Sequence, residues 1–216
     1  MLLLVPRSPL APRRADEHFA PEAAAARQLG VPVAFVDHDQ CSRDGGDADA
    51  AVRAVPGDPD AVHRGWMLRS EQYAAMAGAL ARRGTLRTSP AQFRTAHELP
   101  GWYAALAAVT PESRWTTGAV DWRWLNGAPA GLRDSTESLE HSWAEAVCVP
   151  DSADPAAAQR VADRLLELRG SDLVRRADGV WRGTELGDGQ VSDRPASTPP
   201  AELIGALLAG PAGMGT

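Results

Sequence analysis

The sequence contains no lysine: all 22 of its basic residues are arginine. A lysine ammonium is the compact point charge that many phosphate-binding sites use, whereas arginine offers a planar fork of donors. Any side-chain cation that contacts a phosphate or a carboxylate in this chain is therefore an arginine. Carboxylates outnumber the basic residues, and the net charge is −6. This balance argues against a nucleic-acid-binding surface, which needs clustered positive charge.

Cysteine is scarce and long apolar runs are absent. The two cysteines, Cys41 and Cys148, match no zinc-binding or redox spacing. The apolar segment 1–5 ends at Pro6 and is too short to cross a membrane or to serve as a secretory signal. We therefore expect a cytoplasmic protein with neither a membrane nor a nucleic acid as partner, and its oligomeric state stays open.

The first third of the chain has the pattern of a β-α-β unit. Residues 2–5 and 31–36 are apolar and predict two buried strands, and residues 21–29 between them predict a helix that Gly30 ends. The second strand runs into Asp37-His38-Asp39. Loops at the carboxyl ends of parallel strands commonly collect ligands, so this cluster is either part of a binding site or an ordinary solvated loop.

Further along the chain, helices alternate with short strands. We expect strands at 61–64 and around Leu86 and helices over 71–83, 90–98, 101–108, 155–168 and 200–208, with a loop over 42–59. Ser89-Pro90 and Asp154-Pro155 are typical helix starts, with a capping side chain followed by a first-turn proline. The fold class predicted is α/β, becoming α+β in the C-terminal part. Most of the seven tryptophans are expected to be packing residues.

A candidate metal site lies near the C-terminus, in the sequence Glu185-Leu186-Gly187-Asp188-Gly189. Here a predicted strand, 180–186, meets a glycine turn. A bend at Gly187 would bring the carboxylates of Glu185 and Asp188 to one side, and Mg²⁺ prefers one or two carboxylates together with phosphate oxygens. Gly187 and Gly189 would let the backbone approach a phosphate closely. The alternative is an ordinary strand and turn with solvated acids.

Two other segments contain polar residues close together. In 64–69, Arg64 and Arg69 flank Gly65-Trp66-Met67-Leu68, and either bind an acidic substrate or are solvated beside three core residues. In 133–143, Ser138 and His141 suggest a hydrolase, but no G-x-S-x-G elbow surrounds any serine, so nucleophilic catalysis is disfavoured.

Four segments together resemble bacterial ATP-grasp proteins of uncertain substrate. They are R-G-W-M-L-R-S-E-Q-Y at 64–73, S-P-A-Q-F-R-T-A-H-E-L-P-G-W-Y at 89–103, the stretch 133–143 that ends in H-S-W, and E-L-G-D-G-Q-V-S-D at 185–193. They occur in the expected order and cover most of the chain. The resemblance is therefore more specific than a single glycine motif would be.

The resemblance implies a pre-ATP-grasp parallel-sheet domain, here 1–100, followed by a shortened ATP-grasp-like region, here 101–216. Members of the superfamily hold ATP between two α+β subdomains, activate a carboxylate as an acylphosphate and pass it to an amine or a thiol. By this analogy Glu185 and Asp188 bind Mg²⁺, Arg133 contacts the phosphates as the catalytic basic residue, and Gly187 and Gly189 contribute to the ATP site. Arg64 and Arg69 would face a small carboxylate or peptide substrate.

The chain also departs from the superfamily's pattern. Glu137 and Glu140 stand where lysines are expected, and like charges a few ångströms apart cost about 1–4 kcal/mol in partly exposed settings. Between Leu173 and Arg175 a long region, expected to supply central strands, is absent. These departures predict an ancestral ATP- and Mg²⁺-dependent ligase with impaired activity. The alternatives are a non-catalytic binding or interaction module and a marginally folded product of a shortened gene.

Overall fold

The computed structural model describes residues 1–58, 60–116, 120–127, 129–132, 148–149, 153–168 and 194–209. Its contacts divide the chain into two compact units, Met1–Phe93 with Gly187–Thr216 and Arg94–Leu186. Each unit is described separately below. The predicted division into domains 1–100 and 101–216 stays a prediction.

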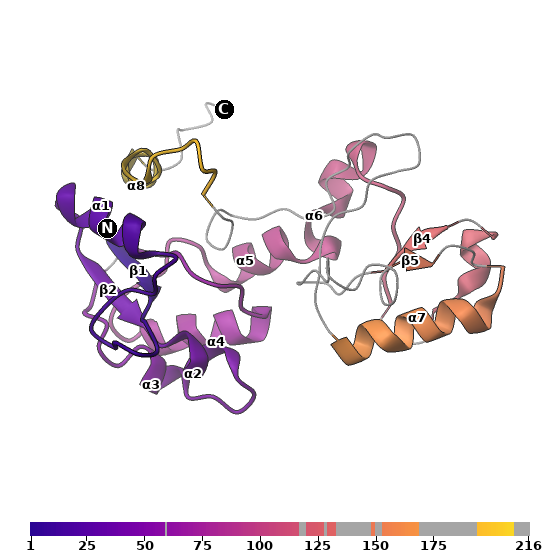
Figure 1. The fold of residues 1–216 in the computed structure, drawn as a ribbon, viewed down its shortest axis with the longest axis horizontal. Coiled ribbons are helices and arrows are strands. Elements are labelled where there is room, and N and C mark those ends of the chain that lie inside the picture. The colour runs from indigo at the N-terminus through magenta and orange to yellow at the C-terminus, as the bar shows by residue number, and fades with distance from the viewer. Residues whose placement is uncertain are drawn as a thin grey trace. The chain divides into compact units, whose positions relative to one another are not determined.

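A three-stranded parallel sheet forms the centre of the first unit (Figure 1). Its strands are β1 (Leu2–Pro6), β2 (Val33–Val36) and β3 (Ala61–His63), in the order β2-β1-β3. Leu4 is in register with Ala34 on one side and with His63 on the other. Because β1 is the central strand, all five of its residues are buried, which agrees with the unbroken apolar run in the sequence.

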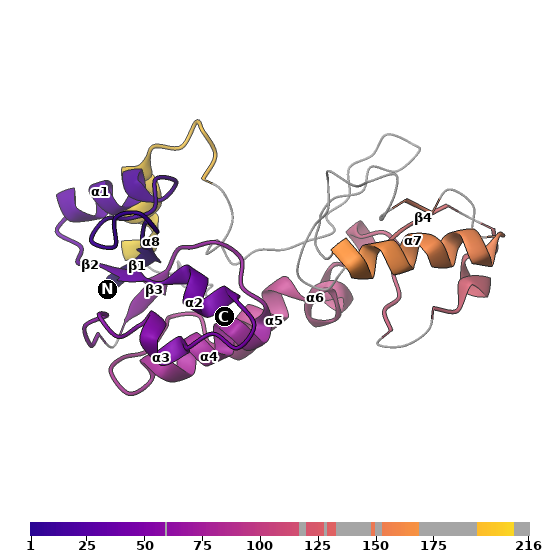
Figure 2. The same cartoon turned by 60° about the horizontal axis from the view of Figure 1, so that its bottom comes forward.

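Helices cover both faces of this sheet. Leu3 and Val5 point to the face covered by α1 (Ala20–Gln28) and α8 (Pro200–Ala209), where Ile204 is fully buried. Helix α8 lies next to α1 in both views, so a helix from the end of the chain completes the core of the first unit (Figure 2). This layer structure confirms the predicted α/β class for this part of the chain.

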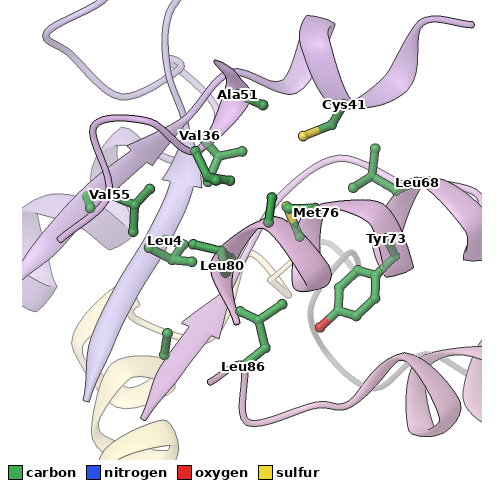
Figure 3. Close-up of a cluster of buried hydrophobic side chains, with 14 of the residues drawn as sticks. Leu4, Val36, Cys41, Ala51, Val55, Leu68, Tyr73, Met76, Leu80 and Leu86 are labelled. Carbon is green, nitrogen blue, oxygen red and sulfur yellow. The ribbon is translucent and has the colours of Figure 1, made fainter. Parts of the chain in front are cut away.

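The opposite face of the sheet carries α2 (His38–Ser42), α3 (Ala48–Ala51) and α4 (Ser70–Leu80). Figure 3 shows the resulting core, in which Leu4 of β1 lies among Met76 and Leu80 of α4. Tyr73 extends the core by stacking on Phe93 with ring centroids 4.0 Å apart, while its hydroxyl donates a hydrogen bond to the Thr88 carbonyl at 2.9 Å.

Several element boundaries differ from the sequence expectation for identifiable reasons. Strand β2 begins at Val33 rather than at residue 31, because the carbonyl of Pro32 accepts a hydrogen bond from Leu3 but its nitrogen has none to donate. Leu86 forms an isolated parallel bridge with Ala61 instead of a strand. Helix α2 was not expected: the side chain of Asp37 caps it by accepting a hydrogen bond from the Gln40 N–H at 3.3 Å.

The second unit is mainly helical where the structure describes it. Its elements are most of α5 (Pro90–His97), α6 (Leu99–Leu106), η1 (Ala107–Val109), η2 (Trp122–Leu125), the antiparallel pair β4 (Ala130–Gly131) and β5 (Cys148–Val149), and α7 (Pro155–Leu168). Trp122 packs against Val149 and Ala158, and its indole N–H donates to Gln159 Oε1 at 3.2 Å.

The two helix starts predicted from serine-proline and aspartate-proline pairs are confirmed. Ser89 and Gln92 exchange hydrogen bonds at the start of α5, and Asp154 Oδ1 accepts from the N–H groups of Ala156 and Ala157 at 3.0 Å at the start of α7. Among the helices described here, none has the length and apolar character needed to span a membrane.

Candidate functional site

The carboxyl ends of the three parallel strands surround a pocket of about 110 Å³ in the first unit. Its lining comes from the end of β1 and the loop that follows, from the start of α2 after β2, and from the loop after β3: Pro6, Arg7, Pro9, Asp16, Asp37, His38, Asp39 and Trp66. The sequence prediction placed Asp37-His38-Asp39 at such an edge, and the structure confirms that placement.

Arg7 and Asp37 join the ends of β1 and β2. Their side chains form an ion pair, and the Arg7 N–H also donates to the Val36 carbonyl at 2.9 Å. The Asp37 side chain is 15% exposed and the Arg7 side chain 33% exposed. Because Asp37 also caps α2, this one carboxylate fixes both the pocket floor and the helix that carries His38 and Asp39.

His38 lies among the three aspartates of the pocket. Burial lowers the pKa of His38 from its ordinary value, and the negative charges of the aspartates, Asp39 foremost, oppose that shift without reversing it. The imidazole is therefore uncharged at neutral pH. The aspartates consequently dominate the charge of the pocket.

Trp66 forms the apolar wall of the pocket and remains 39% exposed. Its ring centroid lies 4.5 Å from that of His18 and 5.0 Å from that of Phe19, so the indole is supported from the side of α1. The glycine before it is required by packing, because a Cβ at Gly65 would lie 2.5 Å from His63 Nε2. The expectation that Trp66 belongs to the core was wrong, whereas Leu68, 1% exposed, is a core residue.

Arg64 is buried rather than solvated. Its Nε donates to Glu22 Oε2 at 2.9 Å and its Nη2 to Glu22 Oε1 at 2.8 Å, in a bidentate pair that links the segment after β3 to α1. The alternative that both arginines of this segment are solvated is therefore wrong for Arg64. A carboxylate of the chain itself occupies its fork, and its assignment to a substrate stays a prediction.

Arg69 lies at the start of α4 and its side chain is 37% exposed. The guanidinium pairs with the exposed carboxylate of Asp44, and the Arg69 N–H donates to Gln72 Oε1 at 2.8 Å. Arg69 does not line the pocket. Its role at a substrate also stays a prediction.

The predicted ATP and magnesium residues lie outside the described part of the chain. These are Arg133, Glu185, Gly187, Asp188 and Gly189, together with Glu137, Glu140, Ser138 and His141. Within the described ranges, no group of three histidine, cysteine, aspartate or glutamate side chains could hold a metal ion. The described residues thus do not supply a magnesium site, and the assignment to Glu185 and Asp188 remains untested.

Sequence reasoning missed three of the pocket residues, Arg7, Pro9 and Asp16. They belong to an ordered loop in which Asp16 N–H donates to the Pro6 carbonyl at 2.9 Å and Ser8 N–H to the Arg14 carbonyl at 2.9 Å. A signal was present in principle, since this loop follows a buried parallel strand and such loops line ligand sites. The pairing of Arg7 with a residue 30 positions away has no sequence spacing that reveals it.

Comparison with known proteins gives one family. No curated protein matches the chain. A sequence model of the ATP-grasp domain, that of clade family 3, matches residues 28–207 and so covers most of the chain, including all four segments that carried the resemblance. The chain therefore belongs to the ATP-grasp superfamily, in the clade family 3 that this model describes.

Proposed function

We propose that this chain descends from ATP- and Mg²⁺-dependent ligases that join a carboxylate to an amine or a thiol, and that it retains weakened nucleotide binding with impaired turnover. The observation that carries the proposal is the family match over residues 28–207, which includes the E-L-G-D-G-Q segment. In this proposal Glu185 and Asp188 bind Mg²⁺, Arg133 contacts the phosphates, and Gly187 and Gly189 let the backbone approach them.

The impairment follows from charge. The chain has no lysine, and Glu137 and Glu140 occupy positions where the superfamily resemblance leads us to expect one. A repulsion of about 1–4 kcal/mol corresponds to a loss of affinity of roughly tenfold to a thousandfold. Arginine can replace lysine at a phosphate because it offers more donors, so Arg133 is the side chain on which residual binding depends most.

On the substrate side, the two arginines of segment 64–69 take different parts in this proposal. The more exposed Arg69 is the one that a carboxylate of the substrate can reach. Arg64, held by Glu22, anchors the segment that carries Arg69. The alternative function, a non-catalytic binding module, is favoured by the same lack of lysine.

Calorimetric titration with ATP in the presence and absence of Mg²⁺ tests the proposal. We expect Mg²⁺-dependent binding by the unaltered chain and none by Asp188→Asn, with an unchanged melting temperature. Asp178→Asn, which removes the same charge outside the E-L-G-D-G-Q segment, is the matched control and should bind normally. Equal binding by the Asp188→Asn variant would refute the metal assignment, and no binding by the unaltered chain would favour the non-catalytic module.

A further inference from the structure

The pocket at the carboxyl edge of the sheet is not explained by the family's segments. Four of its lining residues, Pro6, Arg7, Pro9 and Asp16, precede residue 28, where the family match begins. The pocket combines an apolar wall with a few polar side chains that converge on a small volume, which is the usual composition of a small-molecule site. We therefore considered which ligand its chemistry would select.

Its place in the sheet is the place where open parallel sheets bind ligands. From β1 the chain crosses to β2 through α1 on one face, and from β2 it returns to β3 on the other side of β1 through α2 and α3 on the opposite face. The direction of strand order therefore reverses at β1. The crevice outside the carboxyl ends of the strands at such a switch point is the general location of ligand sites in this architecture.

The pocket has an excess of negative charge. Among its lining residues Arg7 is the one basic side chain apart from the histidine, and Arg7 is already paired with Asp37. Burial keeps the pKa of His38 below its ordinary value, so the imidazole adds no charge at neutral pH. The carboxylates of Asp16 and Asp39 remain, and they come from two different segments, one after β1 and one after β2.

Trp66 provides the other half of the recognition. A tryptophan is the strongest aromatic partner for a cation placed over its face, and the interaction strengthens where the group is partly desolvated. His18 and Phe19 hold the indole in place, so little side-chain freedom is lost when a ligand stacks on it. The volume of about 110 Å³ is smaller than the ~150 Å³ cavity that accepts a benzene molecule, which restricts the site to one small group.

We propose that this pocket binds the cationic end of a small ligand, an ammonium or guanidinium group, with Trp66 contacting its face and Asp16 and Asp39 supplying the counter-charges. An anion would have to displace Asp37 from Arg7, and an uncharged group would leave the excess negative charge without a partner. The inference does not depend on the proposed ATP chemistry, because the site lies within the first unit and its occupation can be measured without nucleotide.

The test compares two probes of the same shape and different charge, n-butylguanidinium and n-butylurea, with inorganic phosphate as a third. Binding is followed in two-dimensional ¹H–¹⁵N NMR spectra of the full chain, with the Trp66 indole signal assigned from its disappearance in Trp66→Phe. We expect n-butylguanidinium to shift this signal saturably and n-butylurea and phosphate to leave it unchanged. An equal response to n-butylurea, a response to phosphate, or no saturable shift with any probe would overturn the proposal.

Matched variants locate the recognition. Asp39→Asn should weaken n-butylguanidinium binding roughly threefold to tenfold, the effect of losing one partly exposed charge contact. Glu17→Gln removes the same charge from an exposed residue next to Asp16 that does not line the pocket, and should leave binding unchanged. Trp66→Leu should also weaken binding. Unaltered affinity in both Asp39→Asn and Trp66→Leu would show that the probe binds elsewhere and would refute the site.

Discussion

Arg64 on the segment after β3 and Glu22 on α1 form a bidentate ion pair that is buried on both sides, with side chains 2% and 5% exposed. The pair crosses 42 residues of sequence and joins a helix to the carboxyl end of a strand. It lies directly before Gly65 and Trp66, so it fixes the backbone that positions the pocket wall. The first arginine of the R-G-W-M-L segment thus has a structural partner within the chain.

Breaking this pair should destabilise the protein strongly. Arg64→Met leaves the Glu22 carboxylate buried without its partner, and such a change typically costs about 3–5 kcal/mol. Urea unfolding measures the loss. The double variant Arg64→Met with Glu22→Leu should recover most of it, because the unpaired charge is removed. Arg69→Met, which breaks the exposed pair with Asp44, is the control and should cost less than about 1 kcal/mol. Equal losses in the two single variants would contradict the assigned role of Arg64.

The low pKa of His38 predicts a loss of stability in mild acid. Its folded-state pKa lies below the ordinary value of 6.5, so the unfolded chain binds the proton more readily. The contribution of His38 to the free energy of unfolding should be constant above about pH 6.5 and should fall as the pH decreases below it. An NMR titration of the imidazole should give a midpoint below 6.5. Asp39→Asn should lower that midpoint further, because it removes the largest of the opposing charges. A midpoint at or above 6.5 would contradict the burial argument.

Cys41 should be unreactive in the folded protein. Burial, reinforced by the charge of Asp37, raises the pKa of its thiol to about 12, so almost no thiolate forms at about pH 8. In a Cys148→Ser variant, reaction with a thiol reagent should be slow in the native state and fast in denaturant. Rapid labelling of the native protein would show that the α2 region opens readily.

Reversing the two acidic charges in the predicted phosphate site should strengthen nucleotide binding. Glu137→Lys with Glu140→Lys replaces repulsion by attraction if both side chains face the phosphates, and we expect affinity for Mg²⁺-ATP to rise at least roughly tenfold. Calorimetry gives the affinity, and Glu112→Lys, outside segment 133–143, provides a control of the same kind of charge reversal. A gain of the same size in the control would show that only the net charge matters.

Much of the first unit follows from local sequence patterns. The unbroken apolar run of β1 predicted a buried strand, Gly30 predicted the end of α1, and the Ser89 and Asp154 caps located two helix starts. These features depend on neighbours in sequence, and that is why they could be identified. The family resemblance came from segments that are mostly ten residues or longer and is confirmed by the match over 28–207.

The contacts that shape the pocket could not be predicted in the same way. The pairs Arg7–Asp37 and Arg64–Glu22 join residues 30 and 42 positions apart, and nothing in either local pattern indicates the partner. The docking of Ile204 beneath β1 likewise depends on the path of the chain through its C-terminal part. Trp66 was expected in the core from its apolar neighbours, but its exposure is decided by the support that His18 and Phe19 give from one side.

The central claim is that a nucleotide site survives in this member of the ATP-grasp superfamily, and the thermal melt of the purified chain with and without Mg²⁺-ATP tests it most directly. A ligand that binds only the folded state raises its melting temperature as the free ligand concentration exceeds the dissociation constant. We predict a cooperative melt that shifts upward with Mg²⁺-ATP, and that does not shift with ATP when Mg²⁺ is chelated. A cooperative melt that ignores Mg²⁺-ATP at millimolar concentration would contradict the claim and favour a non-catalytic binding module.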